Sequence, residues 1–127
     1  MVPLFSTSVM KILLIEPDEY YHSHFSETLG PLGEVVIRQK GQGIGEFLQD
    51  SPPDAVVMEL LLPDRSGYEV LAEIRALSPG RFLPIIIFSE VQGLEDIQSA
   101  LNLGISGYFV KGRDSVHDVK KLLLSLT

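Results

Sequence analysis

The sequence predicts one α/β domain in which a doubly wound, five-stranded parallel sheet is covered by five helices. Three observations lead to this fold class. Five short apolar runs recur along the chain, an amphipathic stretch follows each of them, and glycine or proline turn signals separate the two kinds of segment. Runs that are apolar at every position are typical of strands buried on both faces, as in a parallel sheet. Regular alternation with short links implies right-handed crossovers, which place helices on both faces.

The predicted strands are the apolar runs at residues 11–15, 34–38, 55–58, 85–88 and 108–110, of which the second is the weakest. The predicted helices are the amphipathic stretches at residues 20–29, 44–49, 68–77, 94–103 and 115–126. Gly30-Pro31 closes the first helix, and Gly41 and Gly43 precede the second. Prolines and glycines within residues 51–53 and 78–80 end the second and third helices, and Gly104 ends the fourth.

The length and composition narrow the classes of function. A chain of 127 residues suits one domain and can bury a core without disulfides or metals. It has no cysteine, which excludes disulfides, thiol catalysis and zinc–thiolate sites. The net charge of −7 argues against a nucleic-acid partner, because phosphate binding needs a basic surface.

The amino-terminal residues and the hydropathy pattern indicate a domain that does not enter a membrane. No apolar run approaches the roughly 20 residues that span a bilayer, so we expect no membrane partner and a cytoplasmic location. Residues 1–9 lack the features of a signal peptide. They are interpreted as an extension, which leaves residues 10–127 as the folded domain.

Chemically reactive side chains follow four of the predicted strands. Glu16 and Asp18 come after the first strand, Glu59 after the third, Ser89 after the fourth and Lys111 after the fifth. The carboxyl ends of parallel strands meet at one edge of the sheet, where ligand sites gather. A single carboxylate at such a place is usually a solvated turn residue, but an ordered set of acid, acid, hydroxyl and amine is much less common by chance.

This ordered set resembles the receiver domain of two-component response regulators, over residues 10–126. The resemblance is carried by four segments: Lys11-Ile-Leu-Leu-Ile-Glu-Pro-Asp18, Pro53-Asp-Ala-Val-Val-Met-Glu-Leu-Leu-Leu-Pro-Asp-Arg-Ser-Gly67, Pro84-Ile-Ile-Ile-Phe-Ser89 and Gly107-Tyr-Phe-Val-Lys111. It implies the flavodoxin-like (βα)5 fold and a role in phosphorelay signal transduction. The implied partners are a kinase, an output domain or another signalling protein.

The resemblance also implies a role for each reactive position. In such receivers an aspartate ending the third strand attacks a phosphoryl donor, and two acidic residues after the first strand hold Mg²⁺ with it. A hydroxyl after the fourth strand and a lysine after the fifth contact the phosphoryl oxygens, and an aromatic residue in the fifth strand changes rotamer with the signalling state. The implied positions are Glu59, Glu16 with Pro17, Ser89, Lys111 and Tyr108, with Asp18 in the acidic pocket.

Three departures from this pattern indicate a pseudo-receiver. Glu59 replaces the aspartate, and its extra methylene displaces the carboxylate by about 1.5 Å. A misplacement of about 1 Å can cost on the order of a hundredfold in rate. Pro17 offers no side-chain oxygen to Mg²⁺, which demands near-octahedral oxygen ligands. Gly112 follows Lys111 where the family usually has a cis proline, and a cis bond without proline costs about 2.5–4 kcal/mol, which favours a trans bond.

We therefore expect Glu59 to be no phosphoacceptor and the domain to be no enzyme. Mg²⁺ binding should be weak or absent, with Glu16 and Glu59 as vestigial ligands, and Lys111 should form a standing ion pair with Glu59. The domain would then act through protein contact. Whether it is a fixed, signal-blind domain or a constitutively active-like one stays open, because the single charge of Glu59 imitates a phosphoryl group only in part.

Two alternatives remain. One is a phosphorylatable receiver that uses Glu59 or a nearby aspartate, with Asp18 or Asp64 supplying the missing metal ligand. The other is a small-ligand-binding flavodoxin-like protein, since a fold does not fix a function. The small-ligand alternative lacks support from a glycine-rich phosphate loop, because none follows the first predicted strand.

The last predicted helix suggests a partner surface. At about 100° per residue, one face is expected to join the core and carries Val116, Val119, Leu123 and Leu126. Leu124 points away from that face and Leu122 lies at its edge, which makes a candidate patch of Leu122 and Leu124 with Lys120 and Lys121. The resemblance implies contacts of this kind, including a homodimer, through the fourth helix, fifth strand and fifth helix. The alternative is an ordinary surface, because single exposed leucines are common.

Overall fold

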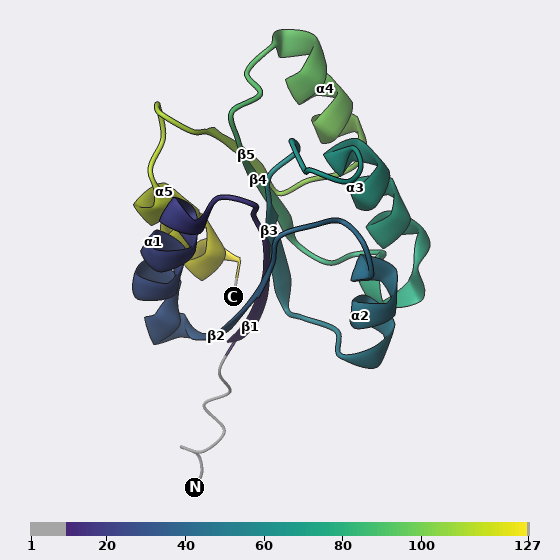
Figure 1. Cartoon of the computed structure of the whole chain (residues 1–127), viewed down its shortest axis with the longest axis horizontal. Helices are drawn as coiled ribbons and strands as arrows, with labels where there is room; N and C mark the ends of the chain where they lie inside the picture. The colour runs from purple at the N-terminus through teal and green to yellow at the C-terminus, as the bar shows by residue number, and fades with distance from the viewer. Residues whose placement is uncertain (1–9, 127) are drawn as a thin grey trace, which may run out of the picture.

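The centre of the molecule is a five-stranded parallel sheet with the strand order β2-β1-β3-β4-β5 (Figure 1). The computed structural model describes residues 10–126. Its strands are β1 (Met10–Ile15), β2 (Gly33–Arg38), β3 (Ala55–Met58), β4 (Ile85–Ser89) and β5 (Gly107–Val110). Every residue of β3 and β4 is buried, which explains why these strands read as unbroken apolar runs.

Five α-helices and two short 3₁₀ turns connect the strands. They are α1 (Glu19–Leu29), η2 (Gly30–Leu32), α2 (Ile44–Asp50), α3 (Gly67–Ala76), η3 (Ser78–Gly80), α4 (Leu94–Asn102) and α5 (Val116–Ser125). The side chains of Asp18, Ser66 and Ser115 cap α1, α3 and α5 by accepting backbone N–H groups of the first turn. These caps fix where each helix begins and therefore where the preceding loop ends.

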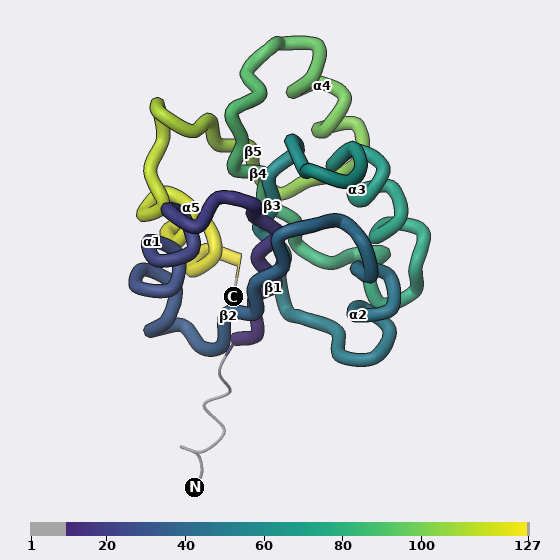
Figure 2. The backbone as a smooth tube through the Cα atoms, in the orientation of Figure 1, coloured from purple at the N-terminus to yellow at the C-terminus, as the bar shows by residue number. Residues whose placement is uncertain are grey.

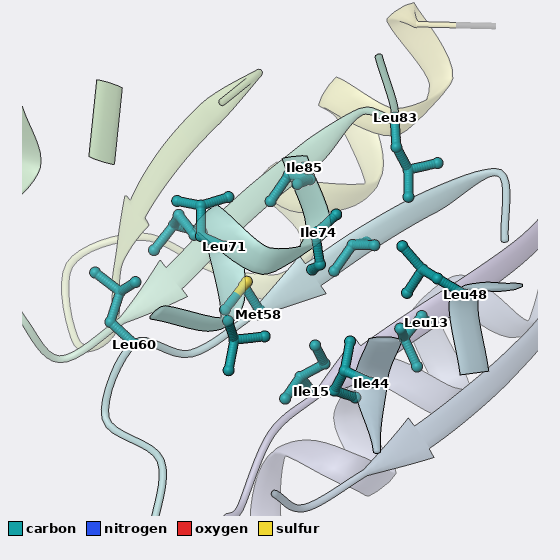
Figure 3. Packing of buried hydrophobic residues seen from close by; sticks show 13 residues of the cluster. Leu13, Ile15, Ile44, Leu48, Met58, Leu60, Leu71, Ile74, Leu83 and Ile85 are labelled. Carbon is teal, nitrogen blue, oxygen red and sulfur yellow. The ribbon is translucent and has the colours of Figure 1, made fainter. Parts of the chain in front are cut away.

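The helices form two layers, one on each face of the sheet. Figure 1 shows α1 and α5 on one face and α2, α3 and α4 on the other. The core is divided accordingly: Phe25, Leu29, Val119 and Leu123 pack on the first face. On the second face, Ile44 and Leu48 of α2 and Leu71 and Ile74 of α3 meet the side chains of β1, β3 and β4 (Figure 3). Helices thus cover both faces of the sheet, so we expect functional residues at the ends and edges of the strands.

The predicted fold class is confirmed, and each predicted strand and helix lies within one residue of its observed bounds. Gly30-Pro31 closes α1 as predicted: the helix ends at Leu29 with Gly30 as its cap, and η2 follows directly. One expectation needs correction. Leu126 is not a core residue: it follows the last residue of α5 as its cap and is 42% exposed. The predicted extension at residues 1–9 lies outside the described residues, as does Thr127.

The loops after β1, β3, β4 and β5 all lie at one end of the sheet (Figure 2). This is a direct consequence of parallel strands, and it brings together segments that are far apart in the sequence. Among residues 10–126, no helix is both long and apolar enough to cross a membrane.

Candidate functional site

Four side chains from four strand ends meet in a buried cluster. Glu16 follows β1, Glu59 follows β3, Ser89 ends β4 and Lys111 follows β5. Glu16 is 1% exposed, Glu59 2% and Ser89 0%. The Lys111 side chain is 5% exposed. The structure therefore brings together the four reactive positions that the sequence indicated, and it encloses them.

Lys111 joins the two carboxylates. Its Nζ lies 2.9 Å from Oε1 and 3.0 Å from Oε2 of Glu16, and 2.9 Å from Oε1 of Glu59. The predicted Lys111–Glu59 ion pair is confirmed. The contact with Glu16 was not predicted, and it makes the lysine a bridge between the ends of β1 and β3.

The Glu59 carboxylate accepts hydrogen bonds from every side of the pocket. Its Oε2 accepts the backbone N–H of Leu60 at 2.7 Å and of Leu61 at 3.0 Å, together with the hydroxyl of Ser89. Its Oε1 faces Lys111 and the backbone N–H of Glu90 at 3.3 Å. The longer side chain thus reaches donors in the β3–α3 loop, the β4–α4 loop and the β5–α5 loop at once.

The cluster carries two carboxylates and one ammonium, a formal charge of −1. Burial raises the pKa of Glu16, against the opposing effects of its hydrogen bonds to Lys111 and Asp18. Burial alone would lower the pKa of Lys111, but its hydrogen bonds to Glu59 and Glu16 outweigh burial and raise it. Lys111 therefore keeps its charge at neutral pH, and among residues 10–126 no buried side-chain polar atom lacks a hydrogen-bond partner.

The two aspartates that could complete a metal site are engaged elsewhere. Asp18 caps α1: its Oδ1 accepts the N–H of Tyr20 at 2.9 Å, and its own N–H donates to Glu16. Asp64 accepts the N–H groups of Gly41 at 2.9 Å and Gln42 at 2.8 Å, which ties the β3–α3 loop to the β2–α2 loop. In the described part of the chain, no three His, Cys, Asp or Glu side chains form a group that could hold a metal ion.

Tyr108 lies beside the cluster and is connected to it by hydrogen bonds through the β4–α4 loop. Its hydroxyl donates to the carbonyl oxygen of Val91 at 2.5 Å, and the N–H of Val91 donates to Ser89 Oγ at 3.0 Å. Ser89 in turn donates to Glu59. Burial raises the pKa of Tyr108 to about 12. A continuous hydrogen-bonded path therefore runs from Glu59 to the aromatic position in β5.

The β5–α5 loop aims Lys111 without a cis peptide. No cis peptide bond occurs within residues 10–126, so the bond between Lys111 and Gly112 is trans, as expected. Gly112 has a φ of +89°, a conformation that favours glycine. The N–H groups of Arg113 and Asp114 both donate to the carbonyl oxygen of Val110, which closes the turn.

One neighbour of the cluster escaped the sequence interpretation. The ring of Tyr21 in α1 lies 4.5 Å from the Lys111 ammonium, in a cation–π contact that covers the amine from the α1 side. Tyr21 also packs edge to face on Phe88 of β4. Aromatic residues at this helix face read as ordinary core positions, so no signal in a single sequence marks the contact.

The candidate patch on α5 is partly exposed. Leu124 is 50% exposed and Lys121 is exposed, whereas Lys120 is half-buried. Leu122 is half-buried and packs against the core cluster shared by α1 and α5. The predicted orientation of Leu124 is confirmed, and the use of this surface remains a prediction.

The comparisons with known proteins agree with the fold described above. The model of the response regulator receiver domain matches residues 12–122. This chain belongs to that family. Among solved structures, the receiver is similar to the phosphorylated cyanobacterial phytochrome response regulator RcpA, with a TM-score of 0.81 and 26% identity over 94% of this chain and 97% of that one. It is equally similar to the receiver domain of the sensor histidine kinase PA1611 from Pseudomonas aeruginosa, solved with magnesium in its active-site cleft: TM-score 0.81, 25% identity, 93% and 97% coverage.

Two curated relatives are larger transcriptional regulators. The receiver is 35% identical to QseB of Escherichia coli O157:H7, over 80% of this chain and 46% of the relative. It is 29% identical to the probable regulator SilR of Salmonella typhimurium, over 80% of this chain and 44% of the relative. The chain therefore spans less than half the length of these relatives, in which other segments complete the protein.

Proposed function

We propose that this receiver domain acts in two-component signalling as a pseudo-receiver, without phosphorylation and without enzymatic activity. It would transmit its state through protein contact. The single observation that carries the proposal is the position of the Glu59 carboxylate, which binds both Ser89 and Lys111. These are the two groups that a receiver uses for phosphoryl oxygens, and both are already engaged.

Charge and access also oppose phosphorylation. A phosphoryl donor is an anion, and it would approach a cluster with a formal charge of −1 that is almost completely buried. To attack in line, Glu59 would have to give up its contacts with Ser89, Lys111 and the loop N–H groups. Each hydrogen bond to a charged group is worth about 1.5–3 kcal/mol, so their combined loss adds a barrier that an unpaired aspartate lacks.

The donor set does not fit the Mg²⁺ that receivers use. Pro17 has no side-chain oxygen, Asp18 is committed to the cap of α1, and Lys111 lies between the remaining two carboxylates. Mg²⁺ requires several oxygen ligands in octahedral geometry. We therefore propose weak or absent Mg²⁺ binding, with the ammonium of Lys111 in place of a divalent cation.

The same contacts support a fixed signalling state. Glu59 holds Ser89, Ser89 accepts from Val91, and Val91 accepts from Tyr108, so one conformation of the β4–α4 loop is stabilised throughout. Because a carboxylate has one charge and a phosphoryl group about −1.5 to −2, this state imitates activation only in part. A domain held constitutively near the active state is the second candidate, and the engagement of both Ser89 and Lys111 favours it.

The decisive experiment exposes the protein to acetyl phosphate with Mg²⁺ and measures its intact mass. We expect no gain of a phosphoryl group. The Pro17→Asp, Glu59→Asp double variant should gain one, because it restores a metal ligand and the shorter nucleophile. The Glu59→Asp single variant is the matched control. It shortens the nucleophile without adding a metal ligand, so it separates the effect of the nucleophile from the effect of the metal site. A phosphoryl gain in the unaltered protein would overturn the proposal.

The partner is proposed to be a protein, namely a kinase, an output domain or another signalling protein, or a second copy of this chain. The α4–β5–α5 face with Leu122, Leu124, Lys120 and Lys121 is the proposed contact, and a cytoplasmic location is part of the same proposal. Replacing Leu124 by Glu should weaken self-association or partner binding, measured by sedimentation. Phe82→Glu is the control, since Phe82 precedes β4 and is 88% exposed. If both variants associate as strongly as the wild-type protein does, this surface is not the contact.

A further inference from the structure

A hollow of about 580 Å³ lies beside β2, one of the two edge strands of the sheet, outside the Glu59 cluster. Its lining residues come from α1, from the carboxyl end of β2 and from the β2–α2 loop: His22, Ile37, Arg38, Gln39, Lys40 and Gln42. Five of these six side chains are polar, two are cations and none is acidic.

The donors of this hollow are available. Among residues 10–126, the side chains of Gln39, Lys40 and Gln42 take part in no hydrogen bond and no ion pair. All three are exposed. An ordinary surface ion pair is worth little, but cationic and amide donors that line one hollow without a hydrogen bond or ion pair can exchange solvent for a ligand.

Arg38 and His22 are held in place more firmly than surface residues usually are. The Arg38 guanidinium stacks on the Phe47 ring at 5.0 Å, and its Nη1 donates to the Ile37 carbonyl at 3.0 Å. The His22 Nε2 lies 2.5 Å from the carbonyl oxygen of Glu16. The stacked guanidinium keeps further N–H donors, since it has five, and a pre-oriented fork suits phosphate oxygens.

Asp64, an acid of the β3–α3 loop, does not compete for these donors in full. Asp64 lies close enough to Lys40 for the lysine charge to lower its pKa, after its hydrogen bonds to Gly41 and Gln42. Its two carboxylate oxygens are taken by those two backbone N–H groups. The backbone of the β2–α2 loop thus already binds the Asp64 carboxylate, while Arg38 and Lys40 are among the residues that line the hollow.

The charge of the lining residues selects the class of ligand. A nucleic acid needs an extended basic surface, which two cations do not supply, whereas a small anion interacts mainly with charges within the Debye length, about 8 Å at physiological salt. We propose that this hollow binds a small anion of the phosphate class. This inference is independent of the phosphorylation state of Glu59.

The test is a titration with inorganic pyrophosphate at constant ionic strength, followed by ¹H–¹⁵N NMR of the whole chain. We expect saturable shifts of the backbone N–H signals of residues 38–42 and of His22. The Arg38→Gln, Lys40→Gln variant should bind at least about tenfold more weakly, as expected for losing charge-assisted contacts. Lys40→Gln alone should show a smaller loss, and because Lys40 is exposed this variant is expected to fold.

The matched control is Lys120→Gln, Lys121→Gln, which removes the same charge from α5. It should bind pyrophosphate like the wild type. Three results would overturn the proposal: no saturable shift in the wild type, unchanged affinity in the Arg38→Gln, Lys40→Gln variant, or shifts centred on α5. Since the readout is binding at residues 38–42, it gives no information on Glu59, and the two proposals fail separately.

Discussion

Replacing Lys111 by methionine tests whether its ion pairs with Glu16 and Glu59 stabilise the buried cluster. The substitution keeps the apolar stem but removes the ammonium that lies within 3.0 Å of both Glu16 and Glu59. Breaking a buried ion pair by removing one partner costs about 3–5 kcal/mol. Domains of this kind have a free energy of unfolding of about 5–15 kcal/mol, so the variant should lose roughly a fifth or more of its stability. At roughly 3–5 °C per kcal/mol, the melting temperature should fall by roughly 10–20 °C.

The pH dependence of this loss follows from the sign of the Glu16 shift. Burial already raises the pKa of Glu16, and losing the lysine raises it further. A group whose pKa is higher in the folded than in the unfolded chain stabilises the fold below its unfolded pKa, and this contribution disappears as the pH rises through the folded pKa. The Lys111→Met deficit should therefore be smaller near about pH 5 than near about pH 8, because a proton can neutralise the unpaired Glu16 carboxylate.

Urea unfolding followed by circular dichroism at several pH values measures both effects. The control is Lys121→Met, on the exposed side of α5, which should change the free energy of unfolding by no more than about 0.5 kcal/mol. If Lys111→Met lowers the free energy of unfolding by less than about 1 kcal/mol at neutral pH, the ion pairs contribute little. The interpretation that they stabilise the buried cluster would then be wrong.

Three further predictions address other parts of the fold. The Arg75 guanidinium donates four hydrogen bonds to the carbonyl oxygens of the η3–β4 and α4–β5 connections, so Arg75→Lys should cost about 1–3 kcal/mol in urea unfolding, and a change under about 0.5 kcal/mol would contradict this role. A Cβ on Gly67 would lie 2.5 Å from the Cα of Leu60, so Gly67→Ala should destabilise by about 1–3 kcal/mol, and an unchanged melting temperature would refute the clash. Tyr108, with a pKa of about 12, should ionise last in a spectrophotometric titration, and Tyr108→Phe should remove that late step; its stabilising contribution is present below the ordinary value of 10.0 and disappears as the pH rises through about 12.

The fold was predictable because its signals are local and repeated. The unbroken apolar runs at β3 and β4 could be recognised without knowledge of their neighbours, and turn residues placed the helix ends within one residue. The prediction for Leu126 was wrong for a physical reason. The helical periodicity of the sequence continues past Ser125, but α5 ends there, so Leu126 does not lie on the buried face of the helix.

The site was predictable only in part. Parallel topology was sufficient to gather Glu16, Glu59, Ser89 and Lys111, and opposite charge was sufficient to pair Lys111 with Glu59. The bridge from Lys111 to Glu16 depends on distances across three strands, which no spacing rule supplies. The N–H donors of Leu60, Leu61 and Glu90 are backbone groups, which every sequence contains, so their convergence on one carboxylate leaves no mark in the sequence.

The extra methylene of Glu59 has a consequence for how such a domain could change by mutation. A reversion to aspartate alone would withdraw the carboxylate from Ser89 and from the Lys111 ammonium without restoring a metal ligand at Pro17. That intermediate would lose contacts of the present state before it gained the chemistry of an active one. The two positions are therefore coupled, and we expect that changes at both Pro17 and Glu59 are needed before the domain accepts a phosphoryl group.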